Sequence, residues 1–268
     1  MSVDAYIPRS GFQVERIAQR RNDLKSAIVD SEVTLFEDNE PTSTRFYERS
    51  IVDYTSRKYQ SVATQSSGTS IFEISRQLEP QSAKHPALMS LLFENDPRSL
   101  KLALIGLGIP VLTDAELKRI QSPEDRRAAE KTRIARIDLS SAKDESSEED
   151  KKKEKEISFY YVTGKERELW VTKDSFLPFR VQWIDPKTRS LFVVEFSNYR
   201  FSDGFAFPSL TRFKANDQII MEIKSNKPQV NLQKLKFLDT VRNGLTSTGI
   251  ELDEDYRRLV KMYYQIFR

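Results

Sequence analysis

Residues 178–199 have the sequence PFRVQWIDPKTRSLFVVEFSNY, and this stretch indicates how the chain folds. From Phe179 to Trp183 apolar residues alternate with polar ones, which is the period of a half-buried strand. Asp185-Pro186-Lys187 predicts a turn, and a second strand is predicted over residues 191–199. A parallel crossover needs about a dozen residues, so these two strands are predicted to be antiparallel neighbours.

The strand pattern continues on both sides of this hairpin. Further strands are predicted over residues 157–161, 168–172, 209–214 and 219–224, and earlier in the chain over 31–37, within 45–59, over 70–76 and from 133 onwards. Most connections are short turns, such as Ser202-Asp203-Gly204. The sequence therefore predicts a mainly β (α+β) chain built around an antiparallel meander.

Helical periods interrupt the β pattern. A stripe of apolar residues predicts a helix over residues 12–28, with Ser10 as its N-cap. Two apolar helices are predicted over residues 87–93 and 100–107, the second ended by a stretch rich in glycine and proline. Further helices are predicted after Thr113, after Ser122 and in the tail, where Tyr256, Leu259, Val260, Tyr263 and Phe267 have helical spacing.

Composition excludes several classes of function. The 268 residues include no Cys, one His and 8 Gly, and 43 basic against 40 acidic residues give a net charge of +3. Disulfides, Cys-based metal sites and multi-His metal centres are thereby excluded. The low number of glycines also argues against a glycine-rich phosphate-binding loop. His85 lies in a polar stretch without a nucleophile signature, and no nucleotide-binding or nucleophile-elbow motif occurs. We therefore expect no enzyme activity, no cofactor and no metal.

The charges are interleaved along the chain, which argues against a nucleic-acid partner. Residues 143–156 hold 12 charged residues, seven acidic and five basic. Such a segment cannot bury apolar area, so we expect a solvated loop there.

Large apolar residues gather on the predicted strand faces and on the central helices. A sheet with one apolar face must cover it or curl around it. The interior is then either a packed core or an apolar cavity that holds a greasy ligand, and periodicity alone does not decide between them. The candidate lining residues are Phe159, Tyr161, Trp170, Phe179, Val181, Trp183, Met221, Ile223, Leu92, Phe93 and Leu104.

Four short motifs carry a family resemblance. They are Leu169-Trp170-Val171, Pro178-Phe179-Arg180, Asn198-Tyr199 and the turn from Gly204 to Pro208. Together with the opening helix and the apolar mid-chain helices, they resemble the LolA/LolB-like lipoprotein carrier family over about residues 12–238.

The resemblance implies an open, strongly curved antiparallel sheet, a half-barrel whose concave face is covered by helices. It implies a monomeric periplasmic carrier of lipid or lipoprotein acyl chains that serves lipoprotein localisation and outer-membrane biogenesis, with a membrane protein as a possible partner. The segment after Met1 is not apolar, so this location implies that a signal peptide has been removed. The family has a lid-latching arginine, for which Arg57 is a candidate because it lies on the second β stretch.

The implied organisation is one domain over residues 1–240, with the charged loop 143–156, and a C-terminal helical extension over 241–268. An alternative is a periplasmic sensing or interaction module of the same fold, which binds a lipid or protein signal and a partner protein. The amphipathic tail from Tyr256 to Phe267 suggests this alternative, because such a helix can dock on another protein.

Overall fold

The computed structural model describes residues 8–66, 68, 70–78, 88–112, 118–120, 122, 132–138, 156–163, 167–238 and 244–245. Of the strands β5 (Thr132–Asp138), β6 (Glu156–Thr163) and β13 (Gly244–Leu245), it describes the backbone alone.

The other strands of the described part are β1 (Ser26–Glu37), β2 (Glu40–Asp53), β3 (Lys58–Thr64), β4 (Ser70–Gln77), β7 (Arg167–Thr172), β8 (Pro178–Ile184), β9 (Leu191–Ser202), β10 (Phe205–Ala215), β11 (Gln218–Ser225) and β12 (Gln229–Val230). All of them belong to one 13-stranded sheet with the order β13-β4-β3-β2-β1-β11-β10-β9-β8-β7-β6-β5, and β12 pairs with β1 off this path. Each described pairing is antiparallel, as the short connections predict.

The sheet consists of two meanders joined by one seam. Strands β1–β4 follow one another in the chain, and so do β5–β11. The seam is the pairing of β1 with β11, which runs from Ser31 opposite Ser225 to Leu35 opposite Met221. On the N-terminal side of Ser31, β1 pairs instead with β12, through Ala27 and Ile28.

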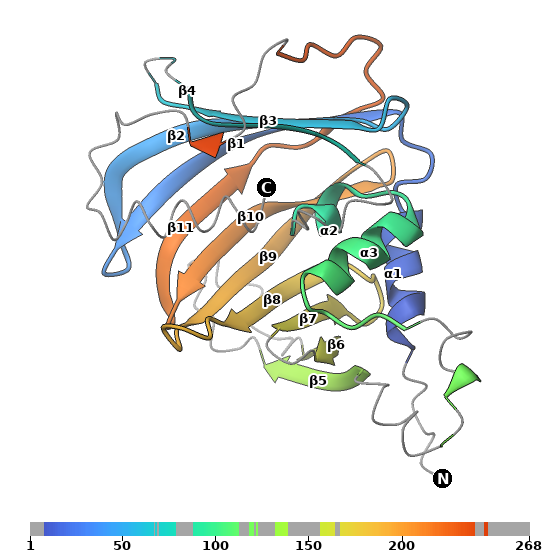
Figure 1. Cartoon of the computed structure of the whole chain (residues 1–268). Coiled ribbons are helices and arrows are strands. Elements are labelled where there is room, and N and C mark those ends of the chain that lie inside the picture. The colour runs from blue at the N-terminus through green and yellow to red at the C-terminus, as the bar shows by residue number, and fades with distance from the viewer. Residues whose placement is uncertain are drawn as a thin grey trace, which may run out of the picture.

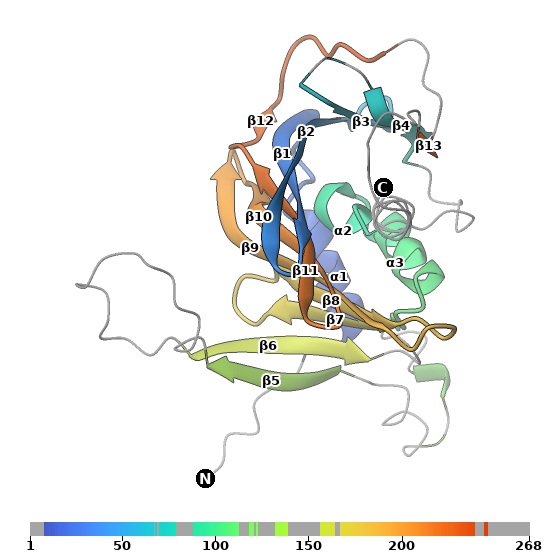
Figure 2. The same cartoon turned by 90° about the vertical axis from the view of Figure 1, so that its left-hand side faces the viewer.

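Three helices of the described part, α1 (Ser10–Gln19), α2 (Ser90–Phe93) and α3 (Pro97–Gly106), lie together on the concave side of the curved sheet (Figures 1 and 2). The sheet is open, with β4 and β13 at one end and β5 at the other. The expected fold class, an open curved antiparallel sheet with helices over its concave face, is therefore confirmed.

The core fills the space between the concave face and the helices. Alternate residues of β1 point inward, and Val29, Val33 and Leu35 are at most 1% exposed. Trp183, Phe192 and Phe213 stack on one another across three strands, with ring centroids 5.5 to 6.2 Å apart. Such aromatic stacks add to the free energy gained from burial alone.

The first helix is shorter than predicted. It ends at Gln19, and Ile28 belongs to β1 instead. Leu24 and Ile28 happen to fit the helical period, but β1 pairs with β2 over this stretch, and tertiary pairing overrides a weak local preference. The N-cap is Arg9, whereas the Ser10 hydroxyl accepts a hydrogen bond from the backbone N–H of Leu112.

A bulge also interrupts the alternation within the strand predicted over residues 219–224. Phe213 lies opposite Met221 and Lys214 lies opposite Ile219, so Ile220 is the extra residue. Ile220 is buried in the core and Ile219 is only half-buried, because a bulge shifts the alternation by one residue.

Several predicted features lie outside the described residues: the helix opened by Ser122, the charged segment up to residue 155, and the tail from Tyr256 to Phe267. Of the helix predicted over residues 114–120, only residues 118–120 are described, and residues 118 and 119 are helical. In the part of the chain that the structure does describe, no helix is long and apolar enough to cross a membrane.

Candidate functional site

Helices α2 and α3 form a lid over the concave face. The connection between them is Glu94-Asn95-Asp96, and Pro97 begins α3 at the position where its missing N–H costs nothing. Asp96 caps α3, since its carboxylate accepts from the backbone N–H of Ser99 at 2.9 Å and from the Ser99 hydroxyl at 2.5 Å. The sequence therefore fixes two short helices with a sharp turn between them.

The underside of the lid is apolar. Leu92, Phe93 and Leu104 are at most 1% exposed and belong to the same core cluster as the strand residues beneath them. The Phe93 ring lies 5.5 Å from the ring of Tyr59 and 5.2 Å from the ring of Phe207, measured between centroids. The lid thus covers an aromatic part of the sheet.

Arg57 fastens the lid turn to the sheet. It lies in the turn between β2 and β3, and its guanidinium forms an ion pair with Glu94 at 3.0 Å. It also donates to the Asn95 side chain at 2.7 Å and to the Leu78 carbonyl at 2.8 Å. Because these contacts are directional, they specify one position of the lid on the sheet.

A second arginine, Arg21, holds the end of α2 from below. Its guanidinium donates to the carbonyl of Leu91 at 2.6 Å and to the carbonyl of Glu94 at 2.8 Å. These bonds satisfy carbonyls that a helix end leaves without intrahelical partners. Burial lowers the pKa of Arg21, whose side chain nevertheless stays charged, since arginine titrates far above neutral pH. Sequence reasoning missed Arg21, because nothing in its surroundings in the chain distinguishes it from a surface arginine.

Sequence reasoning also missed a set of polar side chains on the concave face. The Glu48 carboxylate accepts from the Ser61 hydroxyl at 2.5 Å, and the Ser50 hydroxyl lies 3.3 Å from the hydroxyl of Tyr59. Each of these residues is at most 4% exposed. The apolar face therefore has a buried polar region on β2 and β3.

The structure brings together seven of the predicted lining residues. Val181, Trp183, Met221, Ile223, Leu92, Phe93 and Leu104 all lie in the core cluster. Trp170 and Phe179 lie outside that cluster, and the Arg180 guanidinium is 5.6 Å and 5.7 Å from their ring centres. Phe179 is the extra residue of a bulge between β7 and β8. Phe159 and Tyr161 lie on β6, whose side chains are outside the described part.

The opposite, outer face of the sheet has paired charges. Glu195 contacts Arg180 and Lys214, both at 2.7 Å, and Glu222 contacts Arg212 at 2.8 Å and Lys224 at 3.2 Å. Burial alone raises the pKa of Glu195, but the two cations outweigh it and the pKa lies below its ordinary value. In the described part, no three His, Cys, Asp or Glu side chains are grouped as metal ligands.

Comparison with known proteins gives structural likenesses only. No family model matches the sequence, and no curated protein matches it. A LolA superfamily protein from Nitrosomonas europaea is 10% identical at a TM-score of 0.44, with 85% of this chain and 96% of that chain covered.

Two further solved structures are similar to a comparable degree. An outer membrane lipoprotein-sorting protein domain from Vibrio parahaemolyticus is 12% identical at a TM-score of 0.40, covering 94% of this chain and 98% of that one. A DUF1329 family protein from Desulfovibrio piger is 13% identical at a TM-score of 0.39, covering 84% and 93%.

Proposed function

We propose that this protein binds an apolar ligand, the acyl chain of a lipid or lipoprotein, between the concave face of the sheet and the lid formed by α2 and α3. The observation that carries the proposal is the construction of the lid. Its underside presents the buried apolar residues Leu92, Phe93 and Leu104 to the sheet, and its turn is fastened by the polar contacts of Arg57 and Arg21.

In this lid, apolar contacts supply the attraction to the sheet, and the polar contacts of Arg57 and Arg21 define where the lid lies. Apolar contacts are not directional, so the chain of a ligand can replace the lid residues over the sheet without a large change in free energy. Each buried CH₂ group of such a chain contributes about 0.8 kcal/mol, and a chain of ordinary length therefore binds without any polar recognition. The contacts of Arg57 and Arg21 then define the closed state to which the lid returns.

The proposed role is binding and transfer, with no chemical step. The resemblance of the sequence to LolA/LolB-like carriers supports a periplasmic location and a role in lipoprotein transport. Within this proposal, the ligand contacts are assigned to Val181, Trp183, Met221, Ile223, Leu92, Phe93 and Leu104, the predicted residues that lie in the core cluster.

Two measurements test the proposal. Native mass spectrometry of the protein purified from cells should show adducts with lipid masses, and the delipidated protein should take up a fluorescent fatty acid. Arg57→Ala should accelerate exchange of the fatty acid, because the closed lid loses its fastening. Arg49→Ala, which removes an exposed ion pair with Asp30 on the outer face, should leave exchange unchanged. A delipidated, folded protein that takes up no fatty acid, together with a native spectrum free of adducts, would contradict the proposal.

A further inference from the structure

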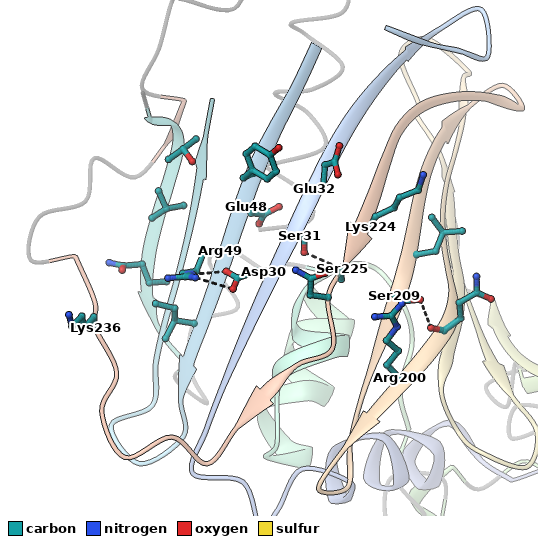
Figure 3. Close-up of a pocket in the computed structure, with 18 of the residues that line it drawn as sticks. Asp30, Ser31, Glu32, Glu48, Arg49, Arg200, Ser209, Lys224, Ser225 and Lys236 are labelled. Carbon is teal, nitrogen blue, oxygen red and sulfur yellow. Dashed lines mark hydrogen bonds and ion pairs between the residues drawn. The ribbon is translucent and has the colours of Figure 1, made fainter. Parts of the chain in front are cut away.

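A groove of about 940 Å³ lies on the face of the sheet opposite the helices (Figure 3). Its lining residues come from six consecutive strands of the sheet order, β3, β2, β1, β11, β10 and β9. Neighbouring strands are about 4.8 Å apart, so a groove across six of them is roughly 24 Å long. None of its outward-facing residues takes part in the lid or the apolar core described above.

The groove follows from two irregularities in the sheet. At Ser31, β1 leaves β11 and pairs with β12, so the two meanders separate at this point on the outer face. On β9, Asn198 has a positive φ of 52° and its carbonyl accepts from the Ser209 hydroxyl, which marks a local break in the ladder. Breaks of this kind reshape the surface of a sheet.

One wall of the groove is a segment that we name the strap, residues 226–238. The Gln60 side chain on β3 donates to the Leu238 carbonyl at 3.1 Å and accepts from the Leu238 N–H at 2.8 Å. Gln60 faces outward yet is only 2% exposed, because the strap covers it. Lys236 and Leu238 of the strap then line the groove.

The charges of the groove differ from those of the rest of the outer face. Elsewhere on this face Glu195 pairs with Arg180 and Lys214. Within the groove Arg49 binds Asp30 through two hydrogen bonds of 2.6 and 2.9 Å, Glu32 pairs with Arg45 at 3.3 Å, and Lys224 pairs with Glu222 at 3.2 Å. The side chains of Arg200 and Lys236, however, form no ion pair or hydrogen bond with any residue in the described ranges. Among the described residues, the side chains of Arg200 and Lys236 are therefore positive charges of the groove that no carboxylate neutralises.

The remaining lining is mixed. Tyr47, Val62, Leu210 and Leu238 supply apolar surface, and the side-chain amides of Asn198 and Asn226 form no hydrogen bond to other described residues. A bare acyl chain would strip water from the Asp30–Arg49 pair and from these amides without replacing its hydrogen bonds. A peptide brings carbonyl and carboxylate acceptors together with apolar side chains, so it suits this lining better.

We propose that the outer groove binds an extended acidic peptide segment of a partner protein. An extended chain rises about 3.3 Å per residue, so the groove accommodates roughly seven residues. Carboxylates of the segment meet Arg200 and Lys236, and its apolar side chains contact Tyr47, Val62 and Leu238. The proposal is independent of the ligand on the concave face.

The probe is a fluorescein-labelled heptapeptide of alternating Asp and Leu, with a peptide of alternating Lys and Leu as its matched control, followed by fluorescence anisotropy. The Asp peptide should bind at least about tenfold more tightly than the Lys peptide, and salt should weaken it. The double variant Arg200→Glu/Lys236→Glu should lose at least about tenfold in affinity for the Asp peptide. Lys187→Glu, in the exposed turn after β8, should change it by less than about twofold.

Fatty-acid uptake by the same double variant is the second readout and should equal that of the unchanged protein. Reduced uptake would mean that the variant disturbs the whole sheet and would remove the support from its peptide result. Equal affinity for the Asp and Lys peptides, or an affinity that the double variant leaves unchanged, overturns the proposal. Displacement of the Asp peptide by inorganic phosphate would reduce the groove to a general anion site, and displacement by dodecanoate would make it a lipid site; either result overturns the peptide assignment.

Discussion

The two faces of the sheet are built from the same strands but differ in burial and in the setting of their ion pairs. On the concave face Trp183 is 6% exposed, and the next residue, Ile184, is 47% exposed on the outer face. The ion pairs differ in the same way, since Arg57–Glu94 fastens the lid with the Glu94 side chain buried, whereas Arg49–Asp30 lies in the open. Position within the pleat, more than residue type, therefore decides what a side chain contributes to the molecule.

The largest expected effect comes from placing a charge on each face in turn. Trp183→Asp replaces a stacked ring by a carboxylate beside the buried rings of Phe192 and Phe213, and it should cost about 4 kcal/mol or more of the free energy of unfolding. Ile184→Asp should cost less than about 1 kcal/mol, because its side chain faces water. Urea denaturation of both variants measures the difference.

Fatty-acid uptake by the Trp183 variant separates core from cavity. An unfolded variant identifies Trp183 as core, and a folded variant without uptake identifies it as a ligand contact. Normal stability together with normal uptake would show that this face of β8 does not point inward.

The next effect compares the two ion pairs. Arg57→Ala leaves the buried Glu94 carboxylate without its cation and should destabilise the protein by about 2 kcal/mol. Arg49→Ala should cost between 0 and about 1 kcal/mol, because the Arg49 side chain is 61% exposed and water screens the pair. Equal free energies of unfolding for the two variants would show that the lid contact is no stronger than a surface ion pair.

The smallest effect is the pH dependence of the outer face. Burial raises the pKa of Glu195. Its contacts with Lys214 and Arg180 lower the pKa by more than burial raises it, so the folded-state pKa lies below the ordinary glutamate value. Its contribution is therefore present above the ordinary glutamate pKa of about 4.3 and is lost as the pH falls through the lower folded-state value. Between about pH 6 and pH 3, Glu195→Gln should flatten the fall in stability by less than about 1 kcal/mol.

Lys214→Met is the matched variant for this measurement. It removes one of the two cations beside Glu195 and should flatten the same curve in part. If both variants follow the curve of the unchanged protein, the outer-face pairs contribute nothing to the pH dependence.

The local parts of this fold could be predicted from the sequence, because each meander is built from neighbours in the chain. Alternation from Phe179 to Trp183 and the turn after it were sufficient to place β8 and β9. The end of α1, the bulge at Ile220 and the exclusion of Phe179 from the core depend on which strand lies alongside, and periodicity carries no such information.

The candidate site was predictable to a similar extent. The apolar residues under the lid have a clear period. Arg57 was a candidate through the family resemblance, and in the structure its side chain contacts the lid turn. Arg21 and the outer groove were not predictable. Arg21 acts on helix α2 some 70 residues away in the chain, and the groove depends on the partner change of β1 at Ser31 and on the break in β9 at Asn198.

The seam between β1 and β11 has a consequence for how the molecule assembles. Ser31 and Ser225, which hydrogen-bond across it, are 194 residues apart, whereas the other strand neighbours from β4 to β5 are consecutive in the chain. Closing so long a loop costs more conformational entropy than forming a hairpin, and long-range pairing is associated with slow folding. We therefore expect the two meanders to form first and the seam last. Until the seam forms, the concave face does not exist as a single surface. A weakened seam should therefore slow refolding and prolong the time in which the apolar faces of the two meanders are exposed to aggregation.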